Sequence, residues 1–169
     1  IDLKRFKFIN DTYGLKVGDY VLGEVASRLV GSLLKPKLVG RLSGDSFAYI
    51  LDHNDDVESE KVLSHLHNLI ERAISFEEQE IHLSCSIGYC YFPEHGIHAE
   101  DLLHKANLAL FHAESTFTPS IGYTEGMQVK GRHLISVEKS IRKAIQQKEF
   151  VLYFQPQLNL ISNRLEGVE

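Results

Sequence analysis

Histidines are the first candidates for metal binding in this chain of 169 residues, because nine are present. Imidazole groups bind zinc when several of them converge on one point. His65 and His67 lie two residues apart on a predicted helix, so their side chains diverge. His95 and His98 flank a glycine in a predicted loop. These spacings do not favour a structural metal site among the histidines.

The two cysteines, Cys85 and Cys90, lie at an odd spacing on one predicted strand. Side chains of a strand alternate between its two faces, so these thiols should point in opposite directions and cannot form a disulfide with each other. A reducing cytoplasm is the natural setting for such a chain.

Charged residues are spread unevenly. The net charge is −5, from 18 Lys and Arg and 23 Asp and Glu. Residues 1–41 carry eight basic residues against four acidic ones, and residues 52–80 carry nine acidic residues against two basic ones. A basic first third could favour a polyphosphate ligand, and solvated faces of opposite sign explain the pattern equally well. The overall acidity does not support a nucleic-acid partner.

The length allows one good core and part of another. The hydrophobic fraction of 43% and the charged fraction of 24% are ordinary for a soluble domain. No apolar run approaches the roughly 18 residues that span a bilayer, and no N-terminal targeting signal is present. We therefore expect a cytoplasmic fragment without a membrane segment, whose parent protein could be tethered through a part that precedes it.

Apolar spacing predicts alternating helices and strands. Helices are predicted from apolar residues three or four positions apart, and strands from short apolar runs or from alternation. Ser43-Gly44-Asp45 lies between two such runs and signals a hairpin, and Asp19 is placed to cap the first helix. The predicted elements are a helix over Asp19–Leu34, strands over Lys37–Leu42 and Ser46–Leu51, a helix over Glu58–Ile74, a strand over Ile81–Phe92 and a helix over Glu100–Glu114.

This order of elements predicts an α+β fold with a mixed or antiparallel central sheet and helices packed on it, rather than a doubly wound parallel sheet. Ile1-Asp2-Leu3 resembles the tail of a strand, so we expect the chain to begin inside a domain.

The last third of the chain reads as a separate region. Residues 115–131 are rich in Ser, Thr, Gly and Pro and predict a loop or linker. The strands predicted after it belong to no sheet begun earlier, so we expect a second domain from about residue 133. The predicted elements are an amphipathic helix over His133–Gln147, strands over Phe150–Gln155 and Gln157–Ile161, and a partner strand over Leu165–Val168 across Ser162-Asn163.

Four ordered segments share the spacing of a known signature. They are Asp2…Phe6-Lys7-x-Ile9-Asn10-Asp11-x-x-Gly14-x-x-x-Gly18-Asp19-x-x-Leu22, Arg41-x-Ser43-Gly44-Asp45-Ser46-Phe47, Ser86-Ile87-Gly88 and Ala106-Asn107-x-Ala109-Leu110-Phe111-x-Ala113. Together they resemble the GGDEF (diguanylate cyclase) domain over residues 1–125. The resemblance implies a nucleotidyl-cyclase-like fold with a ferredoxin-like core, followed by a linker helix and a second domain over residues 126–169.

The resemblance also implies a chemistry. Two GTP molecules on two facing domains, hence a homodimer, are joined by attack of each 3′-hydroxyl on the other's α-phosphate. Mg²⁺ would neutralise the phosphates, and backbone amides would surround them. By resemblance, Asp2, the Leu3 carbonyl and Asp45 take metal positions, Phe6 and Lys7 lie at phosphate, and Asn10 and Asp19 read the guanine edge. Asp19 could instead only cap its helix, and both roles are compatible.

Several residues depart from the family pattern. Ser46 stands where the family has a catalytic Glu, and a neutral hydroxyl replaces neither metal binding nor proton abstraction. Glu114 replaces a Lys that would meet phosphate, which reverses the charge at a polyanion site. Further departures are Lys4 for Asp, Leu15 for His, Ser43 for Gly, and Leu34 and Lys37 for the R-x-x-D product site. We therefore assign no catalytic residue and expect no efficient cyclase activity.

The tail carries a second resemblance. Ile141-Arg-Lys-Ala-Ile145, Glu149-Phe-x-Leu-x-x-Gln-Pro156 and Gly167-Val-Glu169 look like the opening of an EAL phosphodiesterase domain, whose fold is a TIM-like barrel. By resemblance, Glu169 takes a metal position and Gln155 lies near the substrate, cyclic di-GMP. The later carboxylates of that metal site are not in this sequence.

Three hypotheses follow. The leading one is a degenerate domain that binds GTP and regulates the EAL phosphodiesterase of the parent protein through the helix over His133–Gln147. The second is a module that dimerises or docks partners without nucleotide. The third is a residual diguanylate cyclase.

Overall fold

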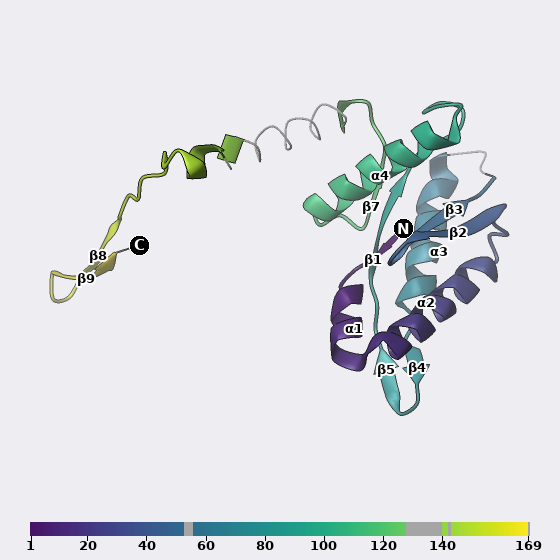
Figure 1. Ribbon diagram of the computed structural model, residues 1–169, viewed down its shortest axis with the longest axis horizontal. Coiled ribbons are helices and arrows are strands. Elements are labelled where there is room, and N and C mark those ends of the chain that lie inside the picture. Colours follow the sequence, from purple (N-terminus) through teal and green to yellow (C-terminus); the bar gives the residue numbers. More distant parts are fainter. Residues whose placement is uncertain (53–55, 128–139, 142, 169) are drawn as a thin grey trace. The chain divides into compact units, whose positions relative to one another are not determined.

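The computed structural model describes residues 1–52, 56–127, 140–141 and 143–168, and the side chains of residues 59–127 within the second range (Figure 1). The chain divides into two compact units, Ile1–Gln128 and Val129–Glu169.

The first unit is built on a five-stranded sheet of order β2-β3-β1-β6-β7. β1 lies in the middle and pairs antiparallel with both β3 and β6, β2 pairs antiparallel with β3, and β7 pairs parallel with β6. The predicted α+β fold with a mixed sheet is confirmed. The strands are β1 (Asp2–Leu3), β2 (Leu38–Ser43), β3 (Ser46–Ile50), β6 (Cys85–Tyr89) and β7 (Ser120–Gly122).

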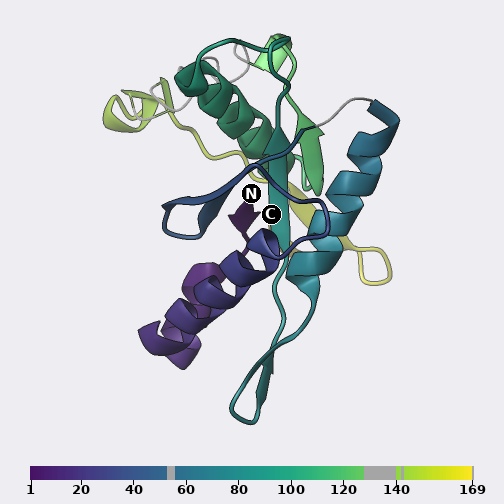
Figure 2. The same ribbon diagram turned by 90° about the vertical axis from the view of Figure 1, so that its right-hand side faces the viewer.

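Helices cover both faces of this sheet (Figures 1 and 2). One face carries α4, whose backbone lies so close to β6 that a Cβ atom at Gly88 would collide with the Ala106 carbonyl and with Leu110. The opposite face carries α2 and α3, and α1 packs against α2. The helices are α1 (Phe6–Tyr13), α2 (Leu15–Val30), α3 (Asp56–Glu71) and α4 (Ala99–Ser115).

The core lies between the sheet and the α2–α3 layer. Burial of each large apolar side chain stabilises the fold by about 1.5–3 kcal/mol, so this layer supplies most of the driving force. Fully buried members include Leu3, Val25, Leu29, Phe47 and Ile70.

Arg28 ties α2 to the end of α3. Its guanidinium donates to the carbonyl of Arg72 at 2.6 Å, of Ala73 at 2.9 Å and of Leu69 at 3.3 Å, and it pairs with Glu24 at 3.0 Å. The last carbonyls of a helix have no partner within the helix, so Arg28 satisfies groups that α3 leaves open.

The boundaries of α2 and α3 differ from the prediction. α2 begins at Leu15, because Gly14 with φ of +86° ends α1 and serves as the N-cap of α2. Asp19 is therefore inside the helix, and its predicted capping role is wrong. α3 ends at Glu71, and Ile74 opens a short hairpin.

The strand predicted over residues 81–92 is confirmed for β6 (Cys85–Tyr89) and is shorter than predicted. The chain forms a hairpin of β4 (Ile74–Phe76) and β5 (Gln79–Ile81) first, and only then β6. The hairpin projects from the unit (Figure 2). β7 falls within the predicted loop over residues 115–131, where a three-residue strand finds its partner in β6 rather than in a sequence neighbour.

The described part of the second unit contains one hairpin, β8 (Pro156–Asn159) with β9 (Arg164–Val168). The predicted strand over residues 150–155 is absent from the described backbone. Of the predicted helix over residues 133–147, positions 133–139 and 142 lie outside the described residues, and 140–141 and 143–146 are helical. The start of a barrel stays a prediction. None of the helices that the structure describes is long and apolar enough to cross a bilayer.

Candidate functional site

The turn between β2 and β3 places Asp45 beside β1. Gly44 adopts φ of +55°, and Arg41 Nε donates to the Gly44 carbonyl at 2.8 Å, which holds the turn closed. The Leu3 amide donates to the Asp45 carbonyl at 3.3 Å. The structure thus brings together Asp2, Leu3 and Asp45, the three residues predicted at metal positions.

Strand register places two hydroxyls beside Asp2. Asp2 lies directly opposite Ser46 on β3 and Ser86 on β6, and opposed residues of antiparallel strands point to the same face. The Ser46 hydroxyl donates to Asp2 Oδ1. The Ser86 hydroxyl is fully buried and, among the described residues, has no hydrogen-bond partner. Sequence reasoning missed Ser86, because only the strand pairing places it next to Asp2.

α4 adds a third carboxyl to the same face. Glu114 lies near the end of α4, and its carboxyl is close enough to Asp2 for the charge of Asp2 to influence its ionisation. We name Asp2, Asp45 and Glu114 together the acidic corner. The three carboxylates repel one another, and their partial burial raises the free energy of the ionised forms.

The electrostatics of the acidic corner reflect this crowding. Partial burial, and next the charge of Asp2, raise the pKa of Asp45, while the Arg41 charge opposes the shift. Partial burial, and then the charge and hydrogen bond of Asp2, raise the pKa of Glu114, while Lys4 opposes the shift.

The donor set suits a hard cation only in part. Carboxylate and carbonyl oxygens are the ligands that Mg²⁺ prefers, and Mg²⁺ commonly takes one or two carboxylates together with substrate phosphates. Asp2, the Leu3 carbonyl and Asp45 match that minimal set. Across the described side chains, no three His, Cys, Asp or Glu residues are arranged to hold a metal ion by themselves. A cation here would therefore need ligands from a bound nucleotide.

Of the predicted guanine-reading residues, Asn10 contacts the α2 residue that directly precedes Asp19. The Asn10 carboxamide on α1 rests so closely on Gly18 of α2 that a Cβ atom there would collide with it and would approach the Phe6 ring at 3.2 Å. Asp19 follows Gly18 directly and is exposed, whereas Asn10 is half-buried. An amide can donate and accept hydrogen bonds and a carboxylate can accept them, so both residue types are able to read a base edge.

The start of α1 lies between these two groups of residues. Arg5, with φ of +59°, turns the chain from β1 into the helix that begins at Phe6. The first amides of a helix, here those of Phe6 and Lys7, lack partners within the helix and attract anions. The two predicted phosphate positions are thus at a helix N-terminus, two residues after β1.

A second polar cluster lies on the opposite face of the sheet. His67 Nε2 lies 2.8 Å from Ser120 Oγ, and His67 Nδ1 lies 3.3 Å from Cys85 Sγ. Burial lowers the pKa of His67 and raises the pKa of Cys85 to about 12, so both groups are neutral near pH 7. Both Cys85 and Cys90 are free thiols. The cluster joins α3 to β6 and β7 and lies apart from the predicted site.

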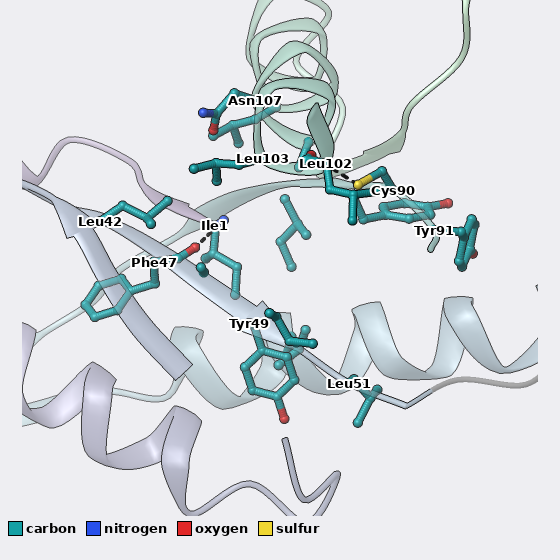
Figure 3. A pocket seen from close by; sticks show the side chains of 18 of the residues that line it. Ile1, Leu42, Phe47, Tyr49, Leu51, Cys90, Tyr91, Leu102, Leu103 and Asn107 are labelled. Atoms are coloured by element: carbon teal, nitrogen blue, oxygen red, sulfur yellow. Dashed lines mark hydrogen bonds between the residues drawn. The ribbon is translucent and has the colours of Figure 1, made fainter. Parts of the chain in front are cut away.

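A cavity of about 370 Å³ lies between β3, β6, α3 and α4 (Figure 3). Its walls are mainly apolar, with Leu42, Phe47 and Leu103 among them, and the Ile1 amine donates to the Phe47 carbonyl at 2.9 Å at its edge. None of the predicted nucleotide-binding residues lines it. The predicted nucleotide-binding residues therefore lie outside this cavity.

Two site residues are predicted for the second unit. Gln155 is exposed and lies just before β8. Glu169 lies outside the described residues.

A mixed sheet with a central β1, two helices in contact through Asn10 and Gly18, and a hairpin turn bearing a carboxylate are the features of a cyclase-type α+β domain. The family model for "Diguanylate cyclase, GGDEF domain" matches residues 1–118. The chain belongs to the GGDEF family.

Curated relatives and solved structures agree. The bifunctional diguanylate cyclase/cyclic di-GMP phosphodiesterase MucR of Pseudomonas aeruginosa is 26% identical over 100% of this chain and 25% of MucR. The cyclic di-GMP phosphodiesterase NbdA of the same organism is 26% identical over 100% of this chain and 22% of NbdA. The chain therefore spans about a quarter of these relatives. The GGDEF domain of TpbB (YfiN) from P. aeruginosa superposes with a TM-score of 0.67 at 30% identity, over 73% of this chain and 78% of that one.

Proposed function

We propose that residues 1–125 form a regulatory domain of cyclic di-GMP signalling that binds a guanine nucleotide and does not efficiently synthesise cyclic di-GMP. The observation that supports the proposal is the contact of Asn10 with Gly18, because it fixes an amide next to the residue that precedes Asp19. GTP is the nucleotide that the family resemblance suggests. The remaining site residues are proposed in the roles given above, with Asp2, the Leu3 carbonyl and Asp45 at the metal and Phe6 and Lys7 at phosphate.

The hydroxyl of Ser46 argues against efficient synthesis. Joining two GTP molecules requires removal of a proton from each 3′-hydroxyl, and general-base catalysis contributes about 10²–10⁴-fold in rate. Ser46 is neutral and its hydroxyl donates a hydrogen bond to Asp2, so it cannot act as a general base. Mg²⁺, when bound with nucleotide, would supply neutralisation of phosphate charge. Glu114 adds negative charge beside the position where that phosphate would lie.

For the second unit we propose the beginning of an EAL phosphodiesterase domain, regulated by the first. The EAL-like residues of the tail support this, as do relatives such as MucR and NbdA, whose names include phosphodiesterase activity. In the whole protein, Glu169 would hold metal and Gln155 would lie near cyclic di-GMP.

Calorimetry on the full chain tests the guanine-binding proposal. We expect guanine nucleotides to bind at least tenfold more tightly than the matching adenine nucleotides in the presence of Mg²⁺. Asp19→Ala should abolish this preference, because the carboxylate that accepts the guanine N–H groups is gone. Asp11→Ala, an exposed acid on α1, is the matched control. Equal affinity for guanine and adenine nucleotides in the unaltered chain would refute the proposal.

A partner-docking module is the second candidate. Phe8 and Leu15 favour it, because these side chains are 65% and 73% exposed on α1 and α2. If Asp19→Ala left nucleotide-stimulated phosphodiesterase activity of the whole protein unchanged, docking would replace nucleotide binding as the function. Residual cyclase activity has a direct assay too: cyclic di-GMP formation that Asp45→Ala abolishes would establish it, and we expect none.

A further inference from the structure

We propose that the cavity between β3 and β6 is a slot for one further length of β-strand. Its occupant is an extended apolar segment that directly precedes Ile1 in a longer protein and continues β1. The inference does not depend on nucleotide binding, because none of the predicted nucleotide-binding residues lines the cavity.

The central sheet has a gap at the start of β1. β1 contains two residues, whereas β3 and β6, which flank it, contain five each. Among the described residues, pairing with β1 reaches only to Phe47 on β3 and to Ser86 on β6. Neighbouring strands of a sheet lie about 4.8 Å apart, so two strands on either side of a third are about 10 Å apart, which admits one strand.

Backbone hydrogen-bonding groups on both sides of this gap point into it. The Ile1 amine donates to the Phe47 carbonyl at 2.9 Å, and the Phe47 amide donates to the Ile1 carbonyl at 2.8 Å. In an antiparallel ladder these groups face the same neighbour at every second residue, so the N–H and C=O of Tyr49 face the gap. On β6, the Ser84 carbonyl accepts a hydrogen bond from β1 at 2.8 Å, so the N–H and C=O of Gly88 face the gap too.

The cavity has apolar walls on both faces of the sheet. Leu63 and Leu66 of α3 line it on one face, and Leu102 and Leu103 of α4 line it on the other (Figure 3). Side chains of a strand alternate between the two faces, so the occupant needs apolar side chains at consecutive positions, as in strands that are buried on both faces. Addition of an extended segment to unpaired strand edges is a recurring mode of peptide recognition.

The Ile1 amine defines where the segment joins β1. This amine lies at the edge of the cavity, and burial lowers its pKa. A peptide N–H in the same place makes the same hydrogen bond without burying a charge. The residue directly before Ile1 would lie opposite Gly88 and face α4, and the residue before that would lie opposite Tyr49 and face α3. The chain spans 25% of the relative MucR, so a protein of comparable length has further residues that can fill the slot.

Hydrogen exchange measured by NMR tests the inference on three forms of the full chain. They are the chain alone, the chain extended by the residues that immediately precede it in the longer protein, and the chain extended by a Gly-Ser segment of equal length. We expect only the natural extension to slow exchange of the Tyr49 and Gly88 amides, by about 100-fold, because exchange then requires the strand to open. The Phe47 amide, already paired with Ile1, should slow by a smaller factor. If a small apolar ligand or a separate protein fills the slot, the natural extension leaves both amides unprotected, and that result would overturn the inference.

Substitutions in the cavity wall give a second measurement. Leu103→Arg places a charge on the α4 side of the slot and should remove the rise in melting temperature that the natural extension causes. Leu33→Arg, at an exposed position outside the cavity, should leave that rise unchanged. A rise in melting temperature without slower exchange at Tyr49 and Gly88 would show that the extension packs elsewhere and would overturn the inference. The exchange comparison of the three unsubstituted forms remains decisive if Leu103→Arg does not fold.

Discussion

The two ends of the candidate site are held by different kinds of interaction. At the α1–α2 end, the Asn10 carboxamide rests on a glycine, so one missing side chain sets the geometry. At the β1–β3 end, Asp2 is surrounded by Ser46, Asp45 and Glu114, so hydrogen bonds and charges set it. The first end depends on steric fit, which tolerates no added volume. The second depends on charge balance, which a single substitution can shift in either direction.

Adding volume at the steric end should have the largest effect. Gly18→Val would displace Asn10 and weaken guanine binding about 100-fold, which corresponds to about 2.7 kcal/mol. Calorimetry with GMP measures this loss. Gly23→Val in the same helix is the matched control, because no atom lies within 4 Å of a Cβ placed at Gly23. Equal loss in both variants would show that helix destabilisation, not the Asn10 contact, is responsible.

The His67 cluster lies apart from both ends of the candidate site, so a variant there separates effects on the stability of the unit from effects on ligand binding. His67→Ala leaves Ser120 and Cys85 without this partner and should lower the free energy of unfolding by about 2 kcal/mol, with guanine affinity of the folded chain unchanged. Urea titration and calorimetry measure the two quantities.

The same cluster predicts a pH dependence. Because the folded pKa of His67 lies below its unfolded value of about 6.5, its contribution to stability is complete above that pH and is lost as the pH falls below it. His67→Ala should flatten this part of the stability curve. An unchanged slope would contradict the assignment.

Adding charge at the electrostatic end should have a smaller effect. Ser46→Glu replaces a donor to Asp2 with a like charge and should lower the free energy of unfolding by about 1 kcal/mol at pH 7 without metal. Millimolar Mg²⁺ should restore that loss, since an added carboxylate completes a set of hard ligands. Ser46→Ala, which loses the hydrogen bond without gaining charge, should not respond to Mg²⁺. A variant Ser46→Glu that is indifferent to Mg²⁺ would show that its carboxylate does not face Asp2.

Removing the charge of Glu114 at the β1–β3 end should have the smallest effect on the free energy of unfolding, and this effect should be stabilising. The folded pKa of Glu114 is raised, so its ionisation costs stability as the pH rises through and above the unfolded value near 4.5. Glu114→Gln should therefore stabilise the chain at pH 7 by less than about 1 kcal/mol, and not at all at about pH 3.5. Urea midpoints at the two pH values decide this. A destabilised variant at pH 7 would mean that the carboxylate is favourably paired.

The sequence predicted the parts of the fold that local chemistry determines. The β2–β3 hairpin was recognisable because Gly44 interrupts two apolar runs, and α4 because its alanines and leucines repeat at helical spacing. The β4–β5 hairpin was not, since its turn uses Glu77 at φ of +54° in place of glycine or asparagine. β7 was missed because its three residues become a strand only by pairing with β6.

The same division holds for the candidate site. The motif predicted site roles for Asp2, Asn10, Asp19 and Asp45 from their spacing, and those roles stay predictions. The hydrogen bond of Ser46 to Asp2 and the buried hydroxyl of Ser86 depend on strand register, which no local pattern specifies.

The hydrogen bonds of Arg28 to the end of α3 couple the movements of α2 and α3. α2 bears Asp19 near its start and Arg28 in its last turn, and the Arg28 guanidinium donates to four carbonyls that end or follow α3. A ligand that displaced Asp19 could not shift α2 along its axis without moving α3 or breaking the Arg28 hydrogen bonds. α2 and α3 would therefore move together, so a displacement of α2 at the Asp19 end would also displace α3.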